Sequence, residues 1–230
     1  MENLNLVLPE IFISLSIMFL LVLGVFKKDS SKLIFNISLL VLLITASITL
    51  NETSNINRTT LFNNSVVIDY MSSLMKIITL VGAFLVLVIS SNYLKIFKIF
   101  KIEYPILILS SVLGMMVMIS SNDLMVFYIG LELQSLALYV LATFNRDQLK
   151  SSEAGLKYFV LSALSSGLLL YGCSLIYGFS GSTNFDIISN QLNSTNYVLT
   201  FGIVFILVGL AFKISAVPFH MWAPDVYEGS

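Results

Sequence analysis

The chain has 230 residues, of which 57% are hydrophobic and only 11% are charged, and its formal net charge is −1. Soluble domains carry about 25% charged residues, so this composition excludes a water-soluble globular protein and indicates a chain surrounded mostly by lipid. The single cysteine, Cys173, excludes a disulfide framework or a cysteine metal site within the chain. No patch of basic and aromatic residues indicates binding to nucleic acid.

Seven apolar segments predict an all-α, polytopic membrane helix bundle, because a spanning helix needs about 20 mostly apolar residues. In chain order they are Leu6–Phe26, Leu33–Leu50, Val67–Ser90, Pro105–Ser120, Leu124–Phe144, Leu156–Tyr177 and Tyr197–Pro218. The N-terminal residues lack the features of a cleaved signal or transit peptide. The first segment is therefore expected to remain as a span.

Polar stretches join these segments. Residues 51–64 and 178–197 are rich in Asn, Ser, Thr and Gly and are predicted to be loops. The turn "SSND" between the fourth and fifth segments places Asn122 and Asp123 where they can cap the next helix.

The basic residues outside the spans predict that the N-terminus lies on the outer side of the membrane. With that orientation the outer connections carry Arg58, whereas the inner ones carry Lys27, Lys28, Lys32, Lys95, Lys98, Lys101, Arg146 and Lys150. Such an excess is typical of inner loops. The segment "YLKIFKIFKIEY" is expected to face anionic lipid, and a partner-binding patch is the alternative.

Lys76, Lys157 and Lys213 fall inside predicted spans, and so does one glutamate near a span centre, Glu132. A charge at the bilayer centre costs about 2.5–3.5 kcal/mol even on insertion scales, so such residues usually face the bundle interior, pair with one another and mark ion pathways. Lys76 lies roughly two turns from the outer end of its span. It is expected to snorkel to that surface or to serve a structural role.

Glu132 shares a helix face with Tyr128, Ser135 and Tyr139, which gives a polar stripe on an otherwise apolar helix. That stripe is expected to face protein or water rather than lipid. A neutral, hydrogen-bonded structural carboxylic acid is the alternative to a functional carboxylate.

Lys213 shares its face with Gly202, Gly209 and Ala216, and small residues let another helix approach closely. Pro218 lacks an N–H, so a break of the seventh helix is predicted near Pro218. Broken helices at membrane depth line cavities, and in transporters they occur at ion sites. Lys213 is therefore predicted to be a switchable proton site, with snorkelling to the inner surface as the alternative.

His220 and Lys157 are two further candidates. Because imidazole exchanges protons near neutral pH, His220 could relay protons between Lys213 and the inner water, or it could simply pack beside Trp222. Lys157 lies about one turn into the sixth segment, where snorkelling and a functional role both stay open. With one histidine and one cysteine, the chain predicts no metal site and no redox chemistry of its own.

Three strings, "YIGLELQSLALYVLATF", "EAGLKYFVLSALSSGLLLYG" and "GLAFKISAVPFHMWAPDVYEGS", closely resemble an antiporter-like membrane subunit family. That family is subunit N of NADH-quinone oxidoreductase, called NADH dehydrogenase subunit 2 in mitochondria. The resemblance implies the first half of a roughly fourteen-helix fold with two inverted five-helix repeats. Residues 1–104 would hold three N-terminal helices and a basic inner loop, and residues 105–230 the start of the first repeat, truncated before its last helix.

The resemblance also implies a proton pathway. Glu132 and Lys213 match the family's proton-pumping pair, Lys157 matches its sixth-helix lysine, and His220 matches the histidine just past the broken helix. The family's lysines of the eighth and twelfth helices would lie beyond Ser230. The chain is therefore expected to be a fragment or one part of a split subunit.

These features predict a proton-translocating membrane subunit of NADH-quinone oxidoreductase (respiratory complex I), in the inner membrane of a bacterium or mitochondrion. Its expected partners are other membrane subunits of the complex and the lipid bilayer. The chain itself is expected to bind no cofactor, while NAD, FMN, iron–sulfur clusters and quinone belong to partner subunits. Two alternatives stay open: a cation/proton antiporter subunit without a redox partner, and a purely structural membrane subunit.

Overall fold

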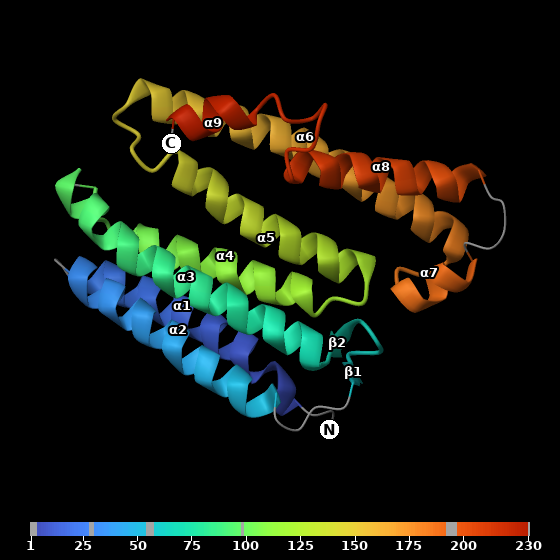
Figure 1. Cartoon of the computed structure of the whole chain (residues 1–230), viewed down its shortest axis with the longest axis horizontal. Coiled ribbons are helices and arrows are strands. Elements are labelled where there is room, and N and C mark those ends of the chain that lie inside the picture. Colours follow the sequence, from blue (N-terminus) through green and yellow to red (C-terminus); the bar gives the residue numbers. More distant parts are fainter. Residues whose placement is uncertain (1–3, 28–29, 54–57, 98, 192–196, 230) are drawn as a thin grey trace. The chain divides into compact units, whose positions relative to one another are not determined.

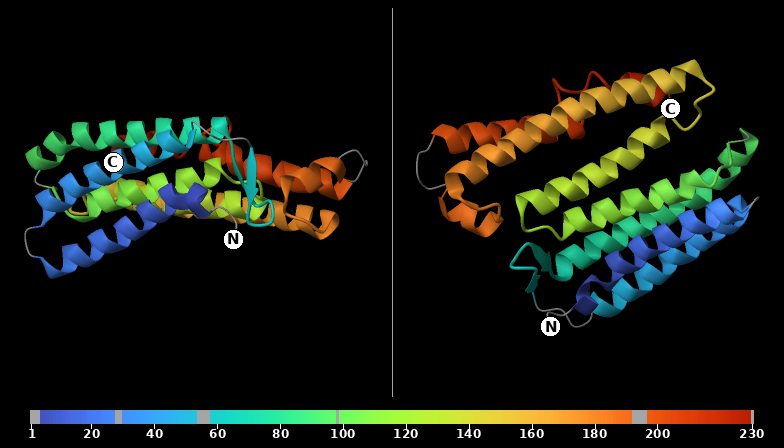
Figure 2. Two further views of the ribbon diagram at one scale, coloured as in Figure 1. Left: turned by 90° about the horizontal axis from the view of Figure 1, so that it is seen from below. Right: turned by 180° about the vertical axis from the view of Figure 1, so that it is seen from behind.

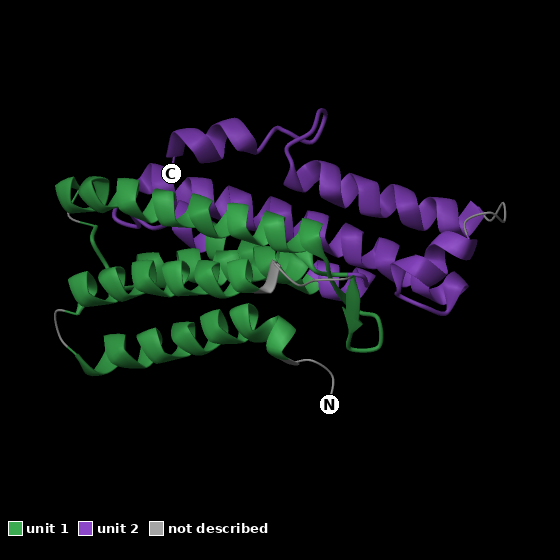
Figure 3. Ribbon diagram, turned by 60° about the horizontal axis from the view of Figure 1, so that its bottom comes forward, with its two compact units in different colours: residues 1–121, 129–138 green, residues 122–128, 139–230 purple. Residues whose placement is uncertain are grey.

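The computed structural model describes residues 4–27, 30–53, 58–97, 99–191 and 197–229 (Figure 1). Two residues of the predicted basic inner loops, Lys28 and Lys98, lie outside the described residues. The chain divides into two compact units (Figure 3). Unit 1 comprises residues 1–121 and 129–138, and unit 2 comprises residues 122–128 and 139–230.

Four long helices make up most of unit 1. They are α1 (Leu8–Phe26), which follows the short 3-10 helix η1 (Leu4–Val7), α2 (Ser31–Thr53), α3 (Tyr70–Ile96) and α4 (Glu103–Ile119). α1 and α3 each pack against both α2 and α4 (Figure 2). The core between these helices includes the fully buried side chains of Ile13, Leu20, Leu42, Leu87 and Leu109.

Polar side chains mark where two helices begin. Asp69 starts α3 with a capping box, in which its Oδ1 accepts from the Ser72 N–H at 2.7 Å and Ser72 Oγ accepts from the Asp69 N–H at 2.9 Å. Asp123 caps α5 (Leu124–Ala142) as predicted, accepting from the N–H of Met125 at 2.8 Å. The side-chain amide of Asn122 instead donates to Asp186, at 2.9 Å.

Within the described residues, unit 2 contains the two ends of α5 (residues 124–128 and 139–142) together with α6 (Leu149–Ser180), α7 (Phe185–Gln191), α8 (Tyr197–Lys213) and α9 (Ala223–Gly229). α6 and α8 lie side by side, and α9 packs on α6 (Figure 1). α6 closes at Gly181, whose φ of 66° is the left-handed conformation that commonly ends a helix.

The long helices confirm the predicted membrane bundle. Within the described part of the chain, α1, α2, α3, α5 and α6 are long and apolar enough to cross a membrane, and α4 and α8 are apolar but shorter, with 17 residues each. Large apolar side chains on these helices are exposed, among them Phe19, Leu85, Leu164 and Phe201. Exposed apolar surface of this kind is what a lipid-facing bundle requires.

The two predicted loops contain secondary structure, which corrects the sequence prediction. The first contains β1 (Thr59–Leu61), which pairs antiparallel with β2 (Val66–Ile68) at the place where the third span was predicted to begin, and the second holds α7. Between the strands, Asn63 and Asn64 take positive φ values of 55° and 65°, which asparagine tolerates better than most residues. Elements this short carry little periodic signal in the sequence, so contacts with the rest of each unit decide their structure.

Candidate functional site

The end of α8 is a Schellman motif, in which a left-handed residue lets the last helical carbonyls accept hydrogen bonds. Ser215 is the left-handed residue, with a φ of 55°. The N–H of Ala216 donates to the carbonyl of Ala211 at 2.8 Å, and the N–H of Ser215 donates to that of Phe212 at 3.1 Å. The predicted break of the helix near Pro218 is confirmed, although the helix itself ends at Lys213, before the predicted end of the segment at Pro218.

Lys213 is the last residue of α8, and its amine is bound by Tyr139 of α5. Its Nζ donates to the Tyr139 hydroxyl at 2.7 Å and lies 5.4 Å from the ring centroid, on the hydroxyl side of the ring. Lys213 is half-buried, whereas Tyr139 is only 4% exposed. A hydroxyl oxygen is a favourable hydrogen-bond acceptor for an ammonium ion.

Tyr139 belongs to an aromatic cluster that consists of Tyr139, Tyr158, Phe159, Phe212 and Trp222. Tyr139 meets the rings of Tyr158 and Phe159 edge-on, with centroids 4.7 and 5.8 Å away. Trp222 stacks on Tyr158 at 4.6 Å and on Phe212 at 5.8 Å. Its Nε1–H also donates to the Phe212 carbonyl at 3.2 Å, so the segment after the break is tied back to the last turn of α8.

The small-residue face that leads along α8 to Lys213 contacts α6, as predicted. A Cβ added at Gly209 would lie 2.7 Å from the Cβ of Leu169, and one added at Gly202 would lie 2.8 Å from Cγ1 of Ile176. Ser165 Oγ of α6 donates to the Gly209 carbonyl at 3.0 Å. The two helices therefore approach as closely as glycine allows, which orients the lysine-bearing end of α8.

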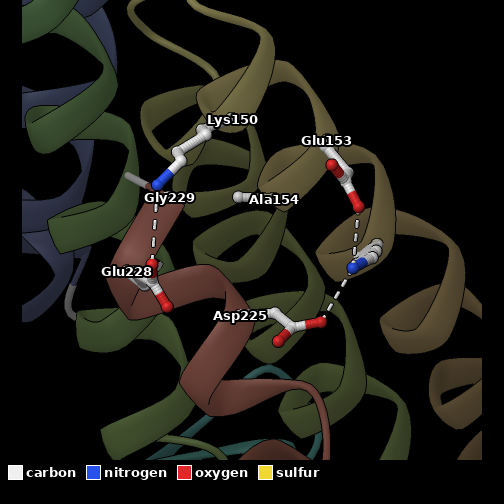
Figure 4. A pocket seen from close by; sticks show the side chains of 7 residues that line it. Lys150, Glu153, Ala154, Asp225, Glu228 and Gly229 are labelled. Atoms are coloured by element: carbon white, nitrogen blue, oxygen red, sulfur yellow. Dashed lines mark hydrogen bonds and ion pairs between the residues drawn. The ribbon is translucent and has the colours of Figure 1, made fainter.

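Lys157 lies on α6 and bridges two carboxylates. Its Nζ lies 2.9 Å from Oε1 of Glu153, one turn earlier, and 2.8 Å from Oδ2 of Asp225 on α9 (Figure 4). Lys150 and Glu228 form a looser pair, 3.6 Å apart, between the same two helices. These charged side chains line a surface pocket. Lys157 thus links α6 to α9, and its place in the proton pathway stays a prediction.

Glu132 lies in the stretch of α5 that belongs to unit 1. Two residues before it, Gly130 packs so closely on α4 that an added Cβ would lie 2.7 Å from the backbone nitrogen of Met118. Glu132 is half-buried next to this crossing. Its pairing with Lys213 would join residues of the two units and stays a prediction.

His220 lies in the segment between α8 and α9, two residues before Trp222, and its side chain is exposed. The position is compatible with exchange of protons with water. The predicted relay between this imidazole and Lys213 stays a prediction.

Unit 1 contains a buried ion pair that the sequence did not lead us to expect. Nζ of Lys76 on α3 lies 2.5 Å from Oε1 of Glu10 in the first turn of α1, and the two side chains are 4% and 9% exposed. The expectation that Lys76 snorkels to the surface is therefore wrong, and the structural alternative fits. The available signal was Glu10 itself, an acid at the start of an apolar span, which periodicity alone does not connect to Lys76.

Comparison of the sequence with known proteins gives consistent results. Residues 121–230 match the family described as NADH:quinone oxidoreductase/Mrp antiporter, TM. Over all 230 residues the chain is 74% identical to NADH-quinone oxidoreductase subunit N of Pelagibacter ubique, covering 49% of that protein. It is 50% identical to the subunit N of Paramagnetospirillum magneticum, with 97% of this chain and 47% of that protein covered. The chain thus spans about half the length of the curated relatives it matches.

Solved structures give the same result for the fold. A chain of respiratory complex I from Thermus thermophilus is 28% identical, with a TM-score of 0.80 over 96% of this chain and 47% of that one. A chain of the membrane-bound sulfane sulfur reductase, an archaeal respiratory membrane complex, is 25% identical, with a TM-score of 0.84 over 98% of this chain and 48% of that one. The antiporter-like membrane fold and the resemblance predicted from the sequence are both confirmed.

Proposed function

Because the chain belongs to the family of NADH-quinone oxidoreductase subunit N, of which it spans about half, we propose that it is part of a proton-translocating membrane subunit of that complex. Other subunits carry out electron transfer from NADH to quinone and hold NAD, FMN, iron–sulfur clusters and quinone. The free energy of that redox reaction drives protons through this subunit, which sits among the other membrane subunits of the complex.

In this proposal Glu132 and Lys213 form an ion pair that is made and broken during turnover. A nearby carboxylate stabilises the charged form of the amine. When that carboxylate moves away, the apolar surroundings favour release of the proton from the amine. Lys157 modulates the charge state of the pair. His220 relays protons between Lys213 and the inner water.

The position of Lys213 at the end of α8 is the observation that carries the proposal. Backbone that leaves the helical conformation at membrane depth is tolerated only where it is buried in protein or lines a watery cavity. The amine of Lys213 lies at such a point, bound to Tyr139, and the following segment leads to the exposed His220. A titratable group placed there can reach water after the helix ends while it stays inside an apolar bundle.

The proposed topology follows from the distribution of basic residues. The N-terminus, the β1–β2 hairpin and α7 lie on the outer side, and α9 with the ion pairs of Lys157 lies on the inner side. The membrane is the inner membrane of a bacterium or mitochondrion. Residues 1–104 supply the three N-terminal helices, and residues 105–230 begin the first of two inverted repeats.

The proposal is tested with Glu132→Ala and Lys213→Ala in the assembled complex that carries the full-length subunit. In inverted membrane vesicles, we expect NADH-driven proton uptake, followed with a pH-sensitive dye, to fall to background in both variants. Oxidation of NADH by an artificial acceptor should stay unchanged, because the redox groups lie in other subunits.

Lys32→Ala is the matched control, since Lys32 is an exposed lysine near the start of α2, and it should pump like the wild type. Wild-type pumping by both Glu132→Ala and Lys213→Ala would overturn the proposal and favour a purely structural subunit. Sodium-dependent proton exchange in vesicles without NADH would instead favour an antiporter without a redox partner.

A further inference from the structure

Tyr139 is the neutral side chain that the structure places on the amine of Lys213. Nζ donates a 2.7 Å hydrogen bond to the Tyr139 hydroxyl and lies 5.4 Å from the ring centroid, so the amine meets the hydroxyl and not the ring face. With 4% of its surface exposed, Tyr139 is among the most buried residues that carry a hydroxyl in unit 2. A buried hydroxyl needs hydrogen-bond partners, and the hydroxyl of Tyr139 accepts a hydrogen bond from the amine of Lys213.

The ring of Tyr139 is connected to α8 by a series of contacts. Its edge contact with Tyr158, the stack of Tyr158 on Trp222, and the bond from Trp222 to the carbonyl of Phe212 connect it to the residue directly before Lys213. The hydrogen bond from Lys213 to Tyr139 completes this series of contacts. The aromatic cluster therefore holds both the amine of Lys213 and the hydroxyl that accepts its hydrogen bond.

The chemistry of the hydroxyl suits a site where an amine changes charge. A tyrosine oxygen that accepts a hydrogen bond from an ammonium ion keeps its own proton to donate, and it can donate that proton to a neutral amine after a small rotation. Tyr139 thus offers contacts to both charge states of Lys213 without itself carrying a charge.

We propose that Tyr139 is a positioning residue for Lys213, and that its hydroxyl holds the amine at the end of α8 through both steps of proton transfer. This inference rests on the proposed role of Lys213 as a proton carrier. In this proposal the aromatic cluster keeps the amine of Lys213 in one place while the carboxylate of Glu132 approaches it and moves away.

Tyr139→Phe tests the inference because it removes the hydroxyl and keeps the ring. In the assembled complex we expect the rate of NADH-driven proton uptake to fall by roughly tenfold or more, since hydrogen bonds to charged groups are the stronger class. Electron transfer to an artificial acceptor and the subunit content of the complex should stay at wild-type levels. Tyr171→Phe is the matched control, because it removes an exposed hydroxyl from α6 outside the aromatic cluster and should leave pumping unchanged.

A second measurement separates positioning from packing. Replacement of Tyr139 by 3,5-difluorotyrosine keeps the ring but lowers the pKa of the phenol, so its oxygen ionises readily beside the amine and holds Lys213 in the charged form; we expect reduced pumping in a complex that assembles normally. Wild-type pumping by both the Tyr139→Phe and the difluorotyrosine complexes, with Lys213→Ala inactive, would overturn the inference and leave the proposed function intact. Wild-type pumping by Lys213→Ala would instead overturn the proposed function.

Discussion

The side chains of Glu10 and Lys76 are removed from water together, between the first turn of α1 and the second turn of α3. Burying an ion costs several kcal/mol, and the attraction between the partners offsets that cost only while both are present. The pair therefore specifies how α1 meets α3 more than it adds to the stability of unit 1.

We expect Glu10→Leu or Lys76→Met alone to lower the free energy of unfolding by about 3–5 kcal/mol, because each leaves an unpaired charge in the core. Thermal unfolding of the chain in detergent micelles measures the effect. The double variant should unfold close to the wild type, since it leaves no buried charge. If the losses of the two single variants simply add in the double variant, the two residues do not act as a pair.

Part of the candidate site could be predicted from single residues. A lysine or glutamate inside an apolar span is conspicuous, which is why Glu132, Lys157 and Lys213 stand out in the sequence. Tyr139 stood out only as one member of a polar stripe, and its bond to Lys213 joins residues 74 positions apart. No helical period relates residues on different helices, so the sequence alone could not reveal this contact.

At the scale of helices, the contact between α6 and α8 depends on glycine. The backbones approach so closely at Gly172, Gly202 and Gly209 that a Cβ at any of them would lie within 3.0 Å of another atom. Gly178 on α6, by contrast, has no atom within 4 Å of the position where a Cβ would stand. The two classes of glycine allow a controlled test of the packing.

Gly209→Ala should destabilise the chain by about 1–3 kcal/mol, because the added methyl group meets the Cβ and Cα of Leu169 and forces the helices apart. Gly178→Ala should be neutral or raise stability by up to about 1 kcal/mol, since alanine favours the helix. Thermal unfolding in detergent compares the two variants. Equal stability of both would show that α6 and α8 do not depend on close approach.

The long helices could be predicted and the short elements could not. Among the described residues, apolar stretches identify the five helices of membrane-spanning length and the two shorter apolar helices α4 and α8, because lipid imposes the same requirement on every span. The hairpin, α7 and α9 have between three and seven residues per element. The end of α8 was misplaced for a related reason: a proline is visible in the sequence, whereas a serine in the left-handed conformation is not.

At the scale of the whole molecule, the residues of the proposed proton pathway are divided between the two units. Unit 1 holds Glu132 and the buried Glu10–Lys76 pair, and unit 2 holds Lys213 with its aromatic cluster and the ion pairs of Lys157. The central claim of the proposed function is that Glu132 and Lys213 form an ion pair that is made and broken during turnover. That claim connects the two units, and it has to be measured in the assembled complex.

Infrared difference spectroscopy of the complex, recorded between the resting state and turnover with NADH, tests this claim most directly. Glu132 should contribute a carboxyl band that disappears in Glu132→Gln. The account predicts that the same band shifts in Lys213→Met, because the carboxylate loses the amine that it meets during turnover. A Glu132 band that is identical with and without Lys213, or the lack of any band that depends on Glu132, would contradict it.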